Sequence, residues 1–203
     1  MKQEIKDTHH GDTIIVLGNG PSLAGFDFRL LQGYVTIGTN VIRKMNFDPD
    51  YLVVMDRKCW LNNKEIVAGG HGTVFIADNV FDAPEQFIRY GRYYNDNPPF
   101  FASEFNDGLF WSNTVIMPAI NLAWLMGAET IILLGLDLHD QAHCHDTENG
   151  MGEEFPRTNK ILKDFERLSE FVKGRRFHIL NANPDSRVKS FPFVEIKHII
   201  ERE

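Results

Sequence analysis

Cysteine is scarce in this chain of 203 residues: Cys59 and Cys144 are its only two, too few for a scaffold held by disulfides. Basic side chains are also in short supply, with 21 lysines and arginines against 28 acidic residues and a net charge of −7. This balance argues against broad binding to nucleic acid. No apolar run approaches a membrane span in length, and no apolar secretion signal follows Met1. We therefore expect a cytoplasmic protein without a membrane span or a nucleic-acid partner.

The remaining composition is that of an ordinary globular domain. Hydrophobic residues make up 43% of the chain and charged residues 24%, which excludes a mainly disordered or collagen-like chain. The length suits one domain that covers residues 1–203, with a loose N-terminus at residues 1–11. There is no internal repeat, low-complexity tract or domain linker. The sequence leaves a homo-oligomeric state open.

Short apolar runs alternate with helical patterns along the chain. Runs of this length without polar alternation are typical of strands that are buried on both faces of a parallel sheet. We expect strands at 13–17, 35–39, 51–55, 73–77, 130–134 and 176–180. We expect helices at 22–31, 60–68, 115–126 and 155–173, and an irregular excursion over one end of the sheet at 81–113. The pattern predicts a Rossmann-like α/β fold, with a mostly parallel sheet and helices on both faces.

Ligands of such sheets bind beyond the carboxyl ends of the strands, so the residues that follow each strand are the first candidates for a site. Asparagine and aspartate are frequent there, although both are also ordinary turn and cap residues. These positions are Gly18–Ser22, Asn40, Asp56, Asp78, Asp137 and Asn181.

The turn Gly18-Asn19-Gly20-Pro21-Ser22 carries the strongest local signal. Its glycines allow a ligand to approach the backbone, and successive N–H groups that lead into a helix attract phosphate oxygens. The turn matches neither a dinucleotide fingerprint nor a phosphate-binding P-loop. A tight strand-to-helix turn without a ligand explains the same residues.

A second candidate lies at Ser112-Asn113-Thr114, before the helix expected at 115–126. The free N–H groups and the positive dipole end of that helix would suit a nucleotide phosphate. Capping of the helix by Asn113 or Thr114 is an equally natural interpretation, and both can hold together.

The third candidate is the histidine-rich run 139–146. Its spacing matches no standard zinc motif, and we favour a single histidine, His143 or His145, as a general acid or base. Asp137 and Asp140 could instead help to hold Mg²⁺ against a diphosphate. Glycines at Gly150 and Gly152 suggest that this loop acts as a lid.

The stretch Val16–Leu23 resembles the opening of the bacterial sialyltransferases of glycosyltransferase family 42 and of the related archaeal 6-hydroxymethylpterin diphosphokinases. In these families a strand runs into a Gly-Asn/Ser-Gly-Pro-Ser-Leu turn. Weaker similarity continues at 38–40, 54–56, 112–114, 122–138, 181–186 and 191–192. The resemblance implies a nucleotide-dependent transferase on a Rossmann-like fold.

Carried over from the sialyltransferases, the residues around a CMP-sugar would be Asn19, Gly20, Ser22, Asn40, Ser112, Asn113 and Thr114. The nucleotide site that we expect also includes Gly18, Pro21, Asp56 and Asp137. The resemblance makes a sialyltransferase-like glycosyltransferase our leading hypothesis, with a small-molecule or glycan acceptor. The phosphates would lie on the first turn and on the Ser112–Thr114 helix start, and His143 or His145 would deprotonate the acceptor hydroxyl.

Two alternatives stay open. Asp56 stands where the sialyltransferases have asparagine, and a carboxylate that faces a phosphate is unfavourable unless a cation intervenes. This favours a Mg²⁺-ATP-dependent diphosphokinase that acts on a hydroxymethylpterin-like molecule, with Asp56 and Asp137 as metal ligands. The tyrosines of the sialyltransferase lid are not matched in this chain, which favours a non-catalytic module that kept the nucleotide fold.

Overall fold

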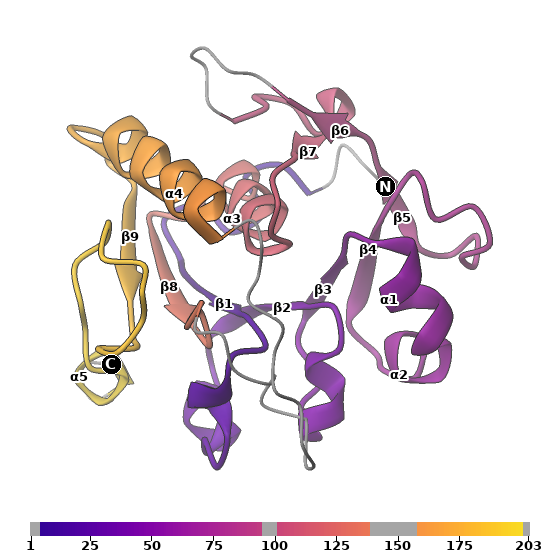
Figure 1. Cartoon of the computed structure of the whole chain (residues 1–203), viewed down its shortest axis with the longest axis horizontal. Coiled ribbons are helices and arrows are strands. Elements are labelled where there is room, and N and C mark those ends of the chain that lie inside the picture. Colours follow the sequence, from indigo (N-terminus) through magenta and orange to yellow (C-terminus); the bar gives the residue numbers. More distant parts are fainter. Residues whose placement is uncertain (1–4, 95–100, 139–157, 201–203) are drawn as a thin grey trace.

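A sheet of seven parallel strands forms the centre of the molecule, and the helices and loops pack around it (Figure 1). The computed structural model describes residues 5–94, 101–138 and 158–200. In sheet order, the strands are β5 (Ile88–Tyr90), β4 (Thr73–Ala77), β3 (Tyr51–Val54), β2 (Val35–Thr39), β1 (Thr13–Leu17), β8 (Thr130–Leu134) and β9 (His178–Asn181).

The order of the strands places a crevice at the centre of the sheet. The chain builds outward from β1 to β5, then passes through α3 (Ile116–Leu125) to the other side of β1, where it forms β8 and β9. Strand β1 therefore pairs with β2 on one side and with β8 on the other. Because the direction of winding reverses between β1 and β8, their carboxyl ends open a crevice in which such folds bind ligands.

The unbroken apolar run of strand β1 is explained by its burial on both faces of the sheet. Ile14, Ile15, Val16 and Leu17 are all 0% exposed. Ile14 and Val16 pack into the hydrophobic core on one face of the sheet, and Ile15 and Leu17 pack into a second core on the other face. Side chains alternate between the faces of a strand, so a strand covered on both sides must be apolar at every position.

Helices cover both faces. Helix α3 and helix α4 (Thr158–Val172) pack on the first core, whereas α1 (Arg57–Asn62) and α2 (Lys64–Ala68) pack on the second. The second face also carries three 3₁₀ turns, η2 (Pro21–Leu23), η3 (Phe28–Leu31) and η4 (Ile42–Met45). This confirms the predicted single-domain, Rossmann-like α/β fold with helices on both faces.

Helix α3 is apolar at every position except Asn121, because nearly all of its surface is enclosed by the protein. All of its residues except Trp124 are buried, and Pro118 occupies its first turn, where no intrahelical N–H bond is lost. The helix is only 10 residues long. Within the described part of the chain, no helix has the length and apolarity needed to cross a bilayer.

Two of the expected helices are wrong in detail. Instead of one helix at 22–31, the chain makes η2 and η3, separated by Gly25 at a φ of +75°, a left-handed conformation that interrupts a helix. The helix expected at 60–68 starts earlier and is broken at Asn63 into α1 and α2. The other two lie close to their predictions: α3 spans 116–125, and α4 covers the described part of 155–173.

The region 81–113 contains strands that the sequence did not reveal. Strand β5 joins the edge of the main sheet at β4. Strand β6 (Arg92–Tyr93) and strand β7 (Leu109–Phe110) then form a separate two-stranded sheet, with the 3₁₀ turn η5 (Phe105–Asp107) just before β7. All three strands have three residues or fewer, too short for a periodic pattern to show.

Both ends of the described chain are attached to the body. The N–H groups of Asp7, His9 and Gly11 donate to the successive carbonyl groups of residues 125–127 at the end of α3, over 3.0, 2.8 and 2.9 Å. Residues 5–11, expected to be loose, therefore complete the C-terminus of that helix.

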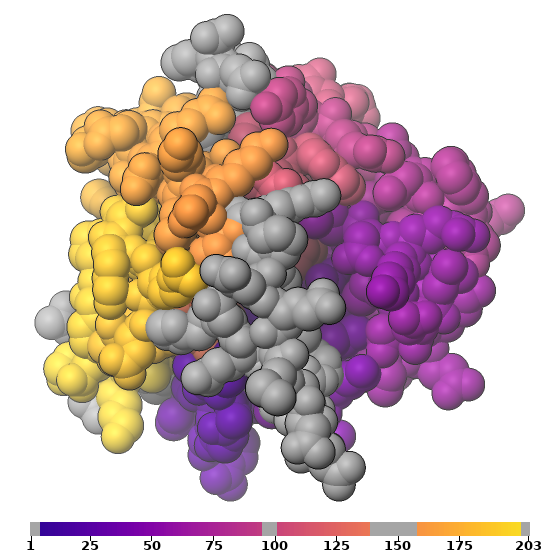
Figure 2. All heavy atoms as spheres, viewed as in Figure 1, coloured from indigo at the N-terminus to yellow at the C-terminus, as the bar shows by residue number. Residues whose placement is uncertain are grey.

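At the other end, the segment that leads to α5 (Ile196–Ile200) lies against α4 (Figure 2). There the rings of Phe165 and Phe191 meet edge to face, with 6.0 Å between their centroids.

Candidate functional site

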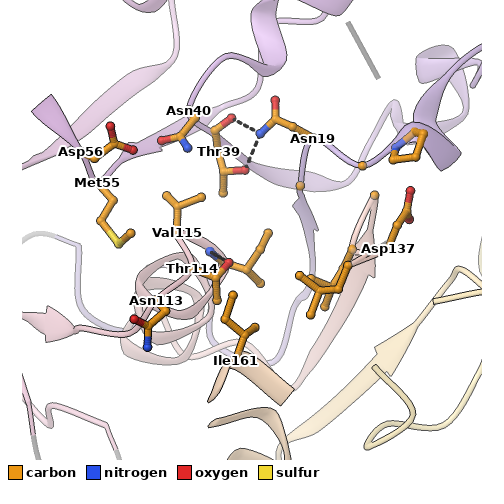
Figure 3. A pocket seen from close by; sticks show the side chains of 17 residues that line it. Asn19, Thr39, Asn40, Met55, Asp56, Asn113, Thr114, Val115, Asp137 and Ile161 are labelled. Carbon is orange, nitrogen blue, oxygen red and sulfur yellow. Dashed lines mark hydrogen bonds between the residues drawn. The ribbon is translucent and has the colours of Figure 1, made fainter. Parts of the chain in front are cut away.

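A cavity of about 290 Å³ opens where the carboxyl ends of β1, β2, β3 and β8 meet the N-terminus of α3 (Figure 3). This is the crevice that the strand order predicts. Its walls contain all the predicted nucleotide-binding residues except Ser22 and Ser112. The lining residues are Gly18, Asn19, Gly20, Pro21, Thr39, Asn40, Met55, Asp56, Asn113, Thr114, Val115, Ile116, Gly135, Leu136, Asp137, Leu138 and Ile161.

The Asn19 side chain is fixed by the neighbouring strand. Its amide nitrogen donates to the carbonyl oxygen of Thr39 over 3.0 Å and lies 3.1 Å from the Thr39 hydroxyl, which itself donates to the carbonyl of Leu17 over 2.8 Å. These bonds orient the amide, and its oxygen is left buried without a donor among the described residues. Figure 3 shows Asn19 and Thr39 joined in this way beside Asn40.

Asn40 supplies a second buried amide oxygen of the same kind. The residue adopts a φ of +47°, a left-handed conformation that asparagine tolerates better than most residues. Its N–H donates to the carbonyl of Val53 over 2.9 Å, and its side-chain oxygen has no donor in the described part of the chain. A buried polar atom without a partner costs about 1–3 kcal/mol, so both amide oxygens call for a donor from outside the described residues.

Asp137 fastens the first turn to the end of β8. Its carboxylate is only 3% exposed and accepts the Ser22 N–H over 2.7 Å, the Ser22 hydroxyl over 2.5 Å and the Asn183 side-chain amide over 2.5 Å. Ser22 thus lies behind the cavity wall, bonded to Asp137. Because both oxygens of this carboxylate already accept protein donors, its position serves to hold the turn.

The glycines of the turn are required by this attachment. A side-chain Cβ on Gly18 would lie 2.3 Å from the carbonyl oxygen of Gly135, and one on Gly20 would lie 2.5 Å from the Asp137 carboxylate. The N–H groups of Gly18 and Gly20 donate to the carbonyls of Leu134 and Gly135, over 2.8 and 2.9 Å. The N–H of Ser22 donates to Asp137 in the same way. These three N–H groups are therefore not free to bind a phosphate, contrary to what the sequence of the turn suggested.

Asp56 lies at the opposite end of the cavity from Asp137, with Asn40 and Thr39 between them (Figure 3). One of its carboxylate oxygens caps α1 by accepting the N–H of Cys59 over 2.8 Å. The structure does not bring Asp56 and Asp137 together around one ion. Among the residues described, no group of three or more histidine, cysteine, aspartate or glutamate side chains could hold a metal.

The single cysteine in the described part of the chain, Cys59, has a thiol of low reactivity. Burial, reinforced by the negative charge of Asp56, raises the pKa of the Cys59 thiol to about 12. The thiol therefore stays protonated at neutral pH, and a protonated thiol is neither a nucleophile nor a metal ligand.

The start of α3 faces the cavity through Asn113 and Thr114. The Thr114 hydroxyl accepts the N–H of Ile116 over 3.3 Å, which caps the first turn. Ser112 turns away, because its hydroxyl donates to Asp164 of α4 over 2.8 Å and the residue is buried there. The positive end of the α3 dipole thus remains near the cavity.

The proposed general bases, His143 and His145, lie outside the described residues, as does the rest of the histidine-rich run. None of the lining residues that the structure describes is a lysine, arginine or histidine. The sequence analysis did not predict that Thr39 lines the cavity, nor that Met55, Val115 and Ile161 form an apolar wall. Thr39 could have been predicted, because it is the last residue of a strand and such residues lie at the ligand edge of the sheet.

Replacing Asp137 by asparagine tests its part in holding the turn. The variant loses one acceptor oxygen and turns an amide donor toward the donors of Ser22 and Asn183, so we expect the free energy of unfolding to fall by about 2–3 kcal/mol. Urea denaturation measures this change. Asp107→Asn is the control, since Asp107 is exposed and should change stability by less than about 0.5 kcal/mol. Equal stability of the two variants would contradict this role.

Comparison with solved structures gives proteins of the same fold. The MAf glycosyltransferase from Magnetospirillum magneticum AMB-1 superimposes with a TM-score of 0.65 at 14% identity, over 94% of this chain but only 34% of that one. The chain thus spans about a third of that enzyme. The sialyltransferase CST-II in complex with a trisaccharide acceptor and CMP gives a TM-score of 0.56 at 15% identity, over 90% of this chain and 85% of that one.

A further structure, of CstII from Campylobacter jejuni with cytidine-5'-monophosphate, gives a TM-score of 0.52 at 16% identity, over 91% and 85% of the two chains. Among curated proteins, none matches the sequence. At the level of families, the model described as 6-hydroxymethylpterin diphosphokinase MptE-like matches residues 1–142, more than two thirds of the chain. The chain belongs to this MptE-like family.

Proposed function

We propose that this protein is a glycosyltransferase that binds a CMP-sugar-type donor in the cavity and transfers the sugar to a hydroxyl of a small-molecule or glycan acceptor. The observation that carries the proposal is the pair of buried amide oxygens of Asn19 and Asn40, which lack donors among the described residues. A nucleoside offers such donors in its ribose hydroxyls and in the amino group of cytosine. Solved sialyltransferase structures that contain CMP share the fold and support the choice of nucleotide.

The distribution of polar groups sets the orientation of the nucleotide in this proposal. The N–H groups of Gly18, Gly20 and Ser22 are engaged within the protein, so the first turn suits the neutral nucleoside better than its phosphate. The N-terminus of α3, at Asn113 and Thr114, suits the phosphate through its dipole. A donor with one phosphate matches this single anion-binding element better than a triphosphate does.

In the proposed reaction, the acceptor hydroxyl oxygen forms a bond to the anomeric carbon while the bond from that carbon to the phosphate oxygen of CMP breaks. The released CMP carries the electron pair of the broken bond. A general base takes the hydroxyl proton, and His143 or His145 remains the proposed base.

Separate replacement of His143 and His145 by alanine tests this assignment. We expect one of the two variants to lose about 100-fold or more in transfer rate while it keeps its affinity for CMP, because a base acts on the acceptor proton and not on the nucleotide. Transfer rates and CMP calorimetry of both variants give the measurement. Unchanged turnover in both would remove these histidines from the mechanism.

A second function, diphosphate transfer from Mg²⁺-ATP to a hydroxymethylpterin-like molecule, is favoured by the family description and by Asp56 in the cavity wall. It would rely on Asp56, since the carboxylate oxygens of Asp137 are already engaged. If it holds, ATP and 6-hydroxymethylpterin yield AMP, and EDTA abolishes the reaction. The glycosyltransferase proposal expects no AMP and a transfer that tolerates chelation. Nucleotide binding without any turnover would instead indicate a non-catalytic module.

Asn40→Gly tests the nucleotide site with little backbone strain. Glycine accepts the φ of +47°, so the variant removes the buried amide oxygen and should keep the fold. We expect CMP affinity in calorimetry to fall about tenfold, the usual effect of one lost hydrogen bond in a buried site. Asn46→Gly is the matched control: Asn46 has a φ of +56°, is exposed and lies outside the cavity wall.

Equal affinity of the Asn40→Gly and Asn46→Gly variants for CMP would show that the amide oxygen makes no contact with the nucleotide. If the wild-type protein binds none of CMP, CDP, UDP and ATP, the proposed function is wrong as a whole.

A further inference from the structure

A second cavity, of about 520 Å³, lies at the opposite end of α3 from the cavity described above, and we call it the α3-end cavity. Four segments form its wall: the residues before β1, the loop before η5, the last turn of α3 with the residues after it, and the loop between α4 and β9. The lining residues are Lys6, Asp7, His10, Ser103, Glu104, Trp124, Leu125, Gly127, Ala128, Arg175, Arg176 and Phe177. The proposed glycosyl transfer uses none of them.

The wall before β1 is fixed to the end of α3. The N–H of Asp7 donates to a carbonyl group in the last turn of the helix over 3.0 Å. A Cβ on Gly127 would lie 3.0 Å from the Cα of His10 and 3.2 Å from a carboxylate oxygen of Asp7, so this glycine lets the segment lie directly on the helix end. An ion pair between Lys6 and Glu104 joins the same segment to the loop before η5. The α3-end cavity is therefore enclosed by segments that are bonded to one another.

One part of the wall is apolar and aromatic. Trp124 is the one residue of α3 that is not buried, and it lines the α3-end cavity. Its ring is held between the rings of Phe101 and Phe171, with centroid distances of 5.8 and 6.4 Å. Leu125 and Phe177 extend this apolar surface. An aromatic ring whose orientation is fixed by its neighbours can pack against the apolar body of a ligand at little cost in side-chain entropy.

Two consecutive arginines supply donors to the same cavity. The guanidinium carbon of Arg175 is 4.3 Å from the centroid of the Phe171 ring, and its Nε donates to the Phe171 carbonyl over 2.7 Å. These contacts orient the guanidinium of Arg175. Its two terminal nitrogens, and the whole guanidinium of Arg176, have no hydrogen-bond partner in the described part of the chain. A guanidinium with free N–H groups matches the two oxygens of a carboxylate, which it can bind through two parallel hydrogen bonds.

The charges of the wall favour a ligand with a single negative charge. Lys6 is neutralised by Glu104, which leaves Asp7 against Arg175 and Arg176 and thus an excess of one positive charge. The negative end of the α3 dipole also lies at this cavity and opposes a highly charged anion. A monocarboxylate therefore fits the wall better than a diphosphate or a triphosphate does.

We propose that the α3-end cavity is a second ligand site, which binds a small organic monocarboxylate with an apolar or aromatic body. The carboxylate binds to the free N–H groups of Arg175 and Arg176, and the apolar body packs on Trp124. This site is separate from the nucleotide site and does not depend on the proposed glycosyl transfer.

Titration of the full chain with 3-phenylpropionate tests the inference, with the indole N–H signal of Trp124 in ¹H–¹⁵N NMR as the readout. The Trp124→Phe variant identifies this signal among those of the three tryptophans. We expect a saturable shift with a Kd of about 1 mM, the range for a ligand of this size. The neutral analogue 3-phenylpropanol should bind about tenfold more weakly, because it lacks the carboxylate that the arginines bind.

The variants Arg175→Gln and Arg176→Gln test the two arginines separately. Each should weaken the binding of 3-phenylpropionate about tenfold. The Arg176→Gln variant should keep the fold, since this side chain has no partner in the described part of the chain. Arg29→Gln is the matched control and should leave the Kd unchanged, since Arg29 pairs with Asp27, is 89% exposed and lies outside the α3-end cavity.

Three results would overturn the second site. The first is no shift of the Trp124 signal up to about 20 mM 3-phenylpropionate, well above the expected Kd. The second is equal affinity for 3-phenylpropionate and 3-phenylpropanol, or an affinity that both arginine variants leave unchanged. The third is inorganic phosphate that binds as tightly as 3-phenylpropionate, which would indicate a general anion site. Carboxylate binding that depends on Arg176 in a protein that does not bind CMP would support the second site and refute the proposed donor instead.

Discussion

The buried carboxylate of Asp137 is the interaction on which the shape of the cavity depends. It joins three parts of the chain that are far apart in sequence: the turn after β1 through Ser22, the end of β8 where it is located, and the turn after β9 through Asn183. A carboxylate that is 3% exposed is costly unless donors surround it, and here three donors do. Asp137 therefore ties together the turns that follow β1, β8 and β9, three strands that are already paired through their backbones.

The bonds to Asp137 and β8 give the Gly-Asn-Gly-Pro-Ser turn a structural role instead of the phosphate-binding role that its sequence suggested. Its glycines let the backbone approach β8 and Asp137, and the N–H groups of Gly18, Gly20 and Ser22 bond within the protein. What the turn contributes to the cavity wall is the Asn19 side chain, and Asn40, just after β2, contributes another amide. The described walls contain no lysine, arginine or histidine. In the proposed complex they would contact the sugar and base of the nucleotide, and the start of α3 would contact the phosphate.

Much of the architecture could be predicted from the sequence, because each buried parallel strand appears as a short, unbroken run of apolar residues. Five apolar runs became central strands within about one residue of their predicted limits, and the sixth shifted by two residues at its start. The rule that ligands bind beyond the strand ends correctly placed Asn40, Asp56 and Asp137 in one cavity wall, whereas Asp78 and Asn181 lie outside it. Strands of two or three residues, such as β6 and β7, are too short to form such a run, and they depend on tertiary pairing.

The directions of side chains could not be predicted in the same way. Ser22 and Ser112 sit in the right loops, yet each turns its hydroxyl toward a buried aspartate, Asp137 or Asp164, and away from the cavity. Serine can bond to a ligand, to its own helix or to a distant carboxylate, and its local sequence is the same in each case. The distance between Asp56 and Asp137 likewise follows from the width of the sheet, which no local pattern encodes.

Helix α3 links the two ends of the domain. Its first turn faces the cavity, and its last carbonyls receive N–H groups from residues 7–11, where His9 also bonds to the Tyr51 hydroxyl at the base of β3. A shortened chain that begins at β1 would leave those carbonyls without the N–H groups that they accept here. Because the first turn of the same helix lines the cavity, any recombinant version should begin upstream of Ile5.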